Sequence, residues 1–219
     1  MASEKLFLIK SSIVVVSKEE CSSDLDENLL SDQKPETIHR KLSRLDYSND
    51  FFITFEKMRL KFEVVIKNQN NFMKSIENLE NRTKEFMKNY IAKNTDFHVK
   101  DMGLNFLFLF IPDRDNYKKH TEELFAKNHK PFKSFERKNN RCDLSYLDNK
   151  NKNRKLVVAF EEGEINEVRQ SENNKRKVLS IDFNNHYNLK TNQELFDIIK
   201  NMKLDYDITK DYLEKLVIT

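Results

Sequence analysis

The stretch GLNFLFLFIPDRD, residues 103–115, is the most strongly patterned part of the chain. It starts with one of only two glycines and continues through eight residues of which only Asn105 is polar, before Pro112 and a charged turn. Large apolar side chains alternate between both sides of this stretch, a pattern typical of a strand covered on both faces. We therefore expect residues 97–111 to form an interior strand buried on both faces. Asn105 is expected to be hydrogen-bonded within the core, because an unsatisfied buried amide is costly.

The segments before this stretch predict strands and one long helix. Residues 6–16 are rich in β-branched residues and indicate a first strand. Residues 51–66 alternate between apolar and polar, which predicts strand structure with one solvent-exposed face and a hairpin or bend near Glu56 and Lys57. Apolar residues in 70–93 recur at helical spacing, apart from a gap at Thr83.

Shorter signals complete the pattern. Pro35 at a first helical position predicts a short helix over residues 35–45. A helix is expected over residues 114–128. Residues 132–183 are expected to form a meander with a tight turn at Glu162 and Gly163.

The C-terminal part is expected to return to helix. Thr191 followed by Glu194 has the spacing of a capping box and predicts a helix start. A last helix is expected over residues 209–217. Together these elements predict an α+β fold: a mainly antiparallel sheet with a C-terminal β-meander, packed against amphipathic helices. We expect one domain over residues 1–219, with a mobile acidic segment near residues 17–34.

Composition argues against several classes of function. The net charge is only +3, from 39 basic and 36 acidic residues, so the surface is mixed in sign. Two glycines cannot supply a phosphate-binding loop of the P-loop or Rossmann type. No apolar run approaches the length of a membrane span, and we expect a cytoplasmic protein without a membrane partner. Two cysteines with no nearby histidine offer no zinc site, so no metal or cofactor is expected.

One set of residues permits an enzymatic alternative. Pro112 and Asp113 follow a strand, and Glu136 and Lys138 lie two residues apart on another expected strand, similar to the PD…ExK arrangement of metal-dependent nucleases. In that arrangement Asp113 and Glu136 would bind the metal and Lys138 would help to position the attacking water. Chance produces about six acid-x-base triplets in a chain of this composition, so the pattern is weak. The five histidines show no metal-binding spacing and are expected to be surface residues.

Basic clusters in the expected meander offer a second alternative, a nucleic-acid-binding surface. If they lay on one face, they could contact phosphates weakly and without sequence specificity. The alternative interpretation is that they form separate solvated loops. The residues concerned are Lys150, Lys152, Arg154, Lys155, Lys175, Arg176 and Lys177.

Three places in the chain resemble a sporadically distributed bacterial family of α+β proteins of unknown function, found near phage-defence and mobile-element genes. The family's mid-chain strand reads "hGLRYhN", and MGLNFLF in this chain matches it at Gly103 and Leu104. A strand followed by a long helix precedes it, as in residues 58–66 and 70–93, and Tyr206, Ile208 and Thr209 are similar to a pattern near the family's end. The family's Arg is Asn105 here. The resemblance implies a fold and a genomic setting, and it supplies no catalytic residue.

These observations favour a non-enzymatic protein-binding module. We expect a phage-defence accessory protein, or an inhibitor encoded by a phage or mobile element, that acts by direct contact with another protein. The nucleic-acid-binding protein and the nuclease are the alternatives.

Overall fold

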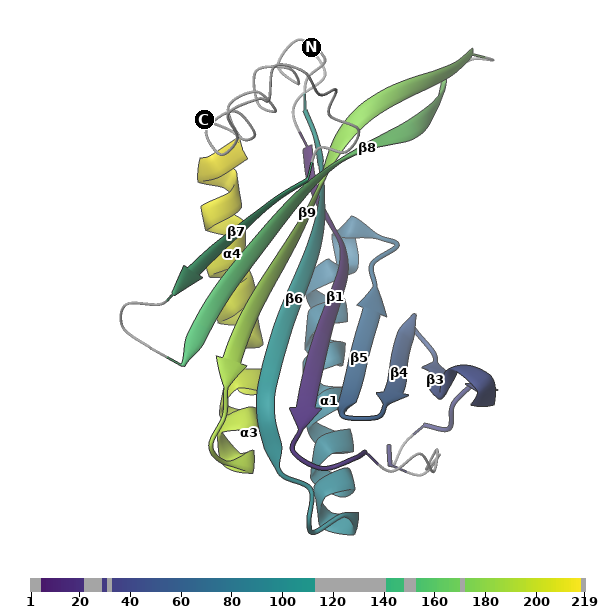
Figure 1. The fold of residues 1–219 in the computed structure, drawn as a ribbon. Helices are drawn as coiled ribbons and strands as arrows, with labels where there is room; N and C mark the ends of the chain where they lie inside the picture. The colour runs from purple at the N-terminus through teal and green to yellow at the C-terminus, as the bar shows by residue number, and fades with distance from the viewer. Residues whose placement is uncertain are drawn as a thin grey trace, which may run out of the picture.

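The structure is a computed structural model that describes residues 5–21, 29–30, 33–112, 141–147, 153–169 and 172–217. The described strands form one antiparallel sheet of nine strands in the order β2-β3-β4-β5-β1-β6-β9-β8-β7. Helices α1, α3 and α4 pack on one face of this sheet (Figure 1). The predicted α+β class, with a mainly antiparallel sheet packed against helices, is confirmed.

The sequence ranges of the elements are as follows. The strands are β1 Lys5–Ser17, β2 Thr37–His39, β3 Arg44–Tyr47, β4 Phe51–Glu56, β5 Arg59–Val65, β6 Val99–Ile111, β7 Arg141–Leu147, β8 Arg154–Arg169 and β9 Glu172–Asn188. The α-helices are α1 Phe72–Lys93, α3 Asn192–Lys200 and α4 Met202–Val217. Two short 3-10 helices are η1 Arg40–Leu42 and η2 Gln69–Asn71.

The most strongly patterned stretch forms β6, which lies in the middle of the sheet between β1 and β9. The helices cover one face of β6, where Phe106 and Phe108 both contact the ring of Tyr206 on α4. The other face is only half-buried, as at Leu107 and Leu109. The predicted interior position is therefore confirmed, and the predicted burial on both faces is wrong, because the described helices cover one face only.

Asn105 lies on this open face and not in the core. Its Nδ2 donates a hydrogen bond to Ser12 Oγ at 3.3 Å, so the predicted hydrogen bond is present in a half-buried setting. The neighbouring Gly103 leaves room for a polar side chain: a Cβ placed there would lie 3.2 Å from Asn184 Oδ1. A side chain at position 103 would therefore displace the Asn184 amide.

Two elements with clear periodicity match their predictions. β4 and β5 pair as a hairpin with its turn at Lys57 and Met58. The long helix is α1, which buries Phe86 in edge-to-face contact with Phe62 of β5. Thr83, the polar gap in the helical pattern, also faces the core and is fully buried, with no hydrogen-bond partner for its hydroxyl.

Two predicted elements are wrong, and in each case the segment instead pairs with another strand of the sheet. Residues 35–45 form β2, η1 and the start of β3 instead of a helix, because Ile38 pairs with Leu45 across an antiparallel ladder. Glu162 and Gly163 do not form a turn: β8 continues through them, and Gly163 pairs with Val178 in β9. The two strands stay paired as far as residues 169 and 172 and extend beyond the rest of the sheet (Figure 1).

The C-terminal helices differ from the prediction in length. Thr191 caps α3 as expected, since its Oγ1 accepts a hydrogen bond from the Glu194 amide at 3.3 Å. The last helix, α4, begins at Met202 and not near residue 209, so it is almost twice as long as predicted. The extra turns carry Asp205 and Tyr206, which reach the sheet.

Some predictions concern residues outside the described ranges. They are the helix over 114–128, the beginning of the predicted meander at residues 132–140 and half of the acidic segment near 17–34. Described residues inside that segment contact the body of the protein: Cys21 and Leu29 are buried, and Asn89 of α1 donates a hydrogen bond to the Leu29 carbonyl at 2.8 Å. Burial raises the pKa of the Cys21 thiol to about 11, so the thiol stays protonated near neutral pH.

Candidate functional site

The predicted nuclease residues, Asp113, Glu136 and Lys138, lie outside the described part of the chain. Their mutual distances therefore stay untested. Within the described ranges, His, Cys, Asp and Glu side chains nowhere gather in groups of three that could hold a metal ion. The described histidines instead lie beside single carboxylates, as His39 does at 3.2 Å from Asp46.

The predicted basic residues that the structure describes do not form one basic surface. Arg154 is turned inward, as described below, whereas Lys155 is exposed on β8. Lys175 pairs with Glu164 across the β8–β9 hairpin at 3.1 Å, and Arg176 donates a hydrogen bond to the Pro112 carbonyl at 2.9 Å. Lys177, also exposed, lies opposite Glu164 in the register. Lys150 and Lys152 are outside the described ranges.

The extended part of the β8–β9 hairpin has no net charge. Between residues 162 and 178 the sequence contains four acidic and four basic residues, namely Glu162, Glu164, Glu167 and Glu172 against Arg169, Lys175, Arg176 and Lys177. In β9, Lys175 pairs with Glu164 and Lys177 lies opposite Glu164 in the register, whereas Arg176 lies opposite Ile165. Such a surface produces a weak field at a distance and does not attract a polyanion strongly.

Arg154 belongs to a polar cluster between α4 and the sheet. Its Nη2 donates hydrogen bonds to Asn185 Oδ1 at 2.8 Å and to Asp205 Oδ1 at 2.9 Å. Tyr187 Oη donates to the other oxygen of Asp205 at 2.7 Å. Burial raises the pKa of Asp205, while the Tyr187 hydrogen bond and the Arg154 charge act in the opposite direction. The cluster attaches α4 to the first residue of β8.

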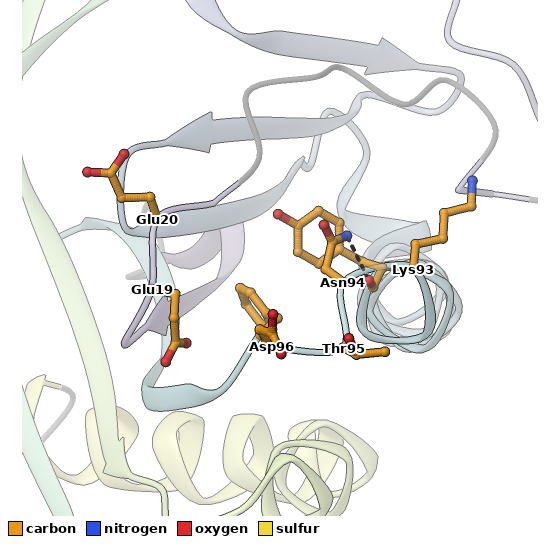
Figure 2. Close-up of a pocket in the computed structure, with 8 residues that line it drawn as sticks. Glu19, Glu20, Lys93, Asn94, Thr95 and Asp96 are labelled. Carbon is orange, nitrogen blue, oxygen red and sulfur yellow. Dashed lines mark hydrogen bonds between the residues drawn. The ribbon is translucent and has the colours of Figure 1, made fainter.

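A surface pocket of about 300 Å³ lies where α1 ends. It is lined by Glu19, Glu20, Tyr90, Lys93, Asn94, Thr95, Asp96 and Phe97. Figure 2 shows the side chains of Glu19, Glu20 and Lys93 pointing in three different directions. Glu19 accepts a hydrogen bond from the His98 amide at 3.0 Å, and Glu20 pairs with Lys57 at 2.8 Å. The carboxylates of this pocket therefore do not converge on a common ligand position.

Exposed apolar side chains gather at one edge of the sheet. The described residues include six large hydrophobic side chains that are exposed, and five of them lie on β7 or α4. We call four of them the edge surface: Tyr146 of β7, and Leu204, Ile208 and Tyr212 of α4; Leu147, next to Tyr146 in the strand, points to the opposite face of the sheet. The sixth, Leu42, lies on η1 next to β2, at the opposite edge.

Both halves of the edge surface lie on the side of the sheet that the helices cover. Leu204, Ile208 and Tyr212 are four residues apart, so they form one row along α4. Asp205, beside this row, reaches Arg154 at the start of β8, and the Tyr212 ring contacts Phe183 of β9. The row is thus on the flank of α4 that faces β8 and β7. The register places Tyr146 opposite Leu156, two residues beyond Arg154, on the same face of the sheet as Arg154.

Sequence analysis missed the edge surface. The spacing of Leu204, Ile208 and Tyr212 is a helical signal, but the predicted last helix began after the first two of them. Even a correct helix boundary would have assigned the row to the core, since apolar residues at helical spacing usually face inward. The core-facing row of α4 contains instead two polar residues, Asp205 and Thr209, which are buried.

Comparison with known proteins found no matching family model, no matching curated protein and no matching solved structure. Among the described helices, none has the length and apolar character that crossing a bilayer requires.

Proposed function

We propose that this protein acts without catalysis, by binding another protein through the edge surface. The observation that carries the proposal is the group of four exposed large hydrophobic side chains on α4 and on the helix side of β7. Exposed apolar side chains scattered singly are common on soluble proteins, whereas a contiguous group marks an interaction site. A central apolar group that a partner buries supplies most of the affinity in typical protein interfaces.

The mixed charge of the protein supports a protein partner over a nucleic acid. Of the predicted basic residues, Arg154 is engaged with Asp205, and Lys175 with Glu164. Nonspecific binding to a duplex depends on several phosphate contacts made at once, so any affinity should be weak and should disappear as salt rises. A role in phage defence or counter-defence rests on the family resemblance alone and belongs to the same proposal.

The test compares two charge substitutions at exposed apolar positions. Ile208→Glu introduces a carboxylate into the edge surface, and Leu42→Glu introduces one at the opposite edge; the two side chains are 49% and 64% exposed, so neither change should unfold the protein. Each tagged variant is used to capture proteins from the native cells, and the captured protein is then purified and titrated by calorimetry. We expect Ile208→Glu to weaken binding at least about thirtyfold, as for a hot-spot residue, and Leu42→Glu to leave it unchanged.

Two results would contradict the proposal. One is a captured partner whose affinity is the same for wild type and for Ile208→Glu. The other is a partner lost equally with Leu42→Glu, since the binding site would then not be on the edge surface.

A further inference from the structure

We draw no further inference here: the strongest candidate, the exposed apolar row of Leu204, Ile208 and Tyr212 along α4, belongs to the edge surface already described, and nothing in the described part of the structure shows what kind of protein segment covers it.

Discussion

The polar cluster under α4 allows a quantitative test of how this helix is held on the sheet. Arg154 and Asp205 are joined at 2.9 Å, and their side chains are only 22% and 10% exposed. Removing one member of a well-buried ion pair costs about 3–5 kcal/mol, because the other charge is left without compensation. Here Arg154 is partly exposed and Asp205 keeps its hydrogen bond from Tyr187, so the cost should be smaller. We expect Arg154→Met to lower the free energy of unfolding by about 2–3 kcal/mol at neutral pH.

Replacing the other member of the ion pair, Asp205, should lower the free energy of unfolding by less. Asn at position 205 can accept from Arg154 and still bond Tyr187, whose hydroxyl both donates and accepts. Replacing the carboxylate also removes the penalty for burying a charge, which is the larger influence on its pKa. We expect Asp205→Asn to cost about 1 kcal/mol, and the double variant to cost less than the sum of the two single changes.

The pH dependence gives an independent test. A carboxyl whose folded pKa is raised binds its proton more tightly when folded, so its contribution to stability is complete below the unfolded pKa and is lost as pH rises through the folded pKa. The pKa of Asp205 is already raised, and loss of Arg154 removes one influence that lowers it. The cost of Arg154→Met should therefore shrink when pH falls from about 7.5 to about 5.

Urea unfolding followed by circular dichroism at the two pH values measures all these quantities. Wild type and the three variants are compared at the same ionic strength. Two results would contradict this explanation: an Asp205→Asn variant that is less stable than Arg154→Met, or a cost of Arg154→Met that is unchanged at the lower pH. Either result would show that Arg154 does not stabilise the protein by compensating the charge of Asp205.

Three further predictions concern the core, each checked by urea unfolding. Gly103→Ala should lower the free energy of unfolding by about 1 kcal/mol, because its Cβ would lie 3.2 Å from an asparagine oxygen. Gly163→Ala, whose Cβ would have its nearest atom at 3.5 Å, should be neutral or slightly stabilising, and equal costs of the two changes would contradict this prediction. Phe106→Ala should cost about 3–5 kcal/mol and Leu107→Ala about half as much, and the reverse order would mean that the open face is covered. Thr83→Val should stabilise by about 1 kcal/mol, since the buried hydroxyl has no partner; a destabilised variant would show that it has one.

Much of the fold follows from local periodicity. The alternation in residues 51–66 and the helical spacing in residues 70–93 both reflect burial of one side of an element, which is a property of the sequence itself. β6 was located for the same reason. Its second face was misjudged because Leu107 and Leu109 are apolar although no described helix covers them. Alternation shows that two faces exist and not which one a helix will cover.

The errors arose where a distant pairing overrides a local signal. Residues 35–45 have helical spacing, but Ile38 and Leu45 meet across β2 and β3. Gly163 predicted a turn, yet its backbone is regular strand, and among the described residues the left-handed positions are Ser43, Asn49 and Asp50. Asparagine and aspartate adopt this conformation more readily than other non-glycine residues. A chain with two glycines therefore makes part of its turns with other residues.

The site was hidden from sequence analysis for a related reason. Basic residues were counted along the chain, but the electrostatic field depends on neighbours in space. Arg154 ends beside Asp205, which is 51 positions away in the sequence, and Lys175 ends beside Glu164 in the next strand. Among the described residues, pairing in the sheet therefore places Lys175 in a hairpin without net charge and Arg154 in a half-buried ion pair. The same pairing makes β7 the outermost described strand on the side of β8, and the exposed apolar side chains of β7 and α4 are those on which a partner gains most by excluding water.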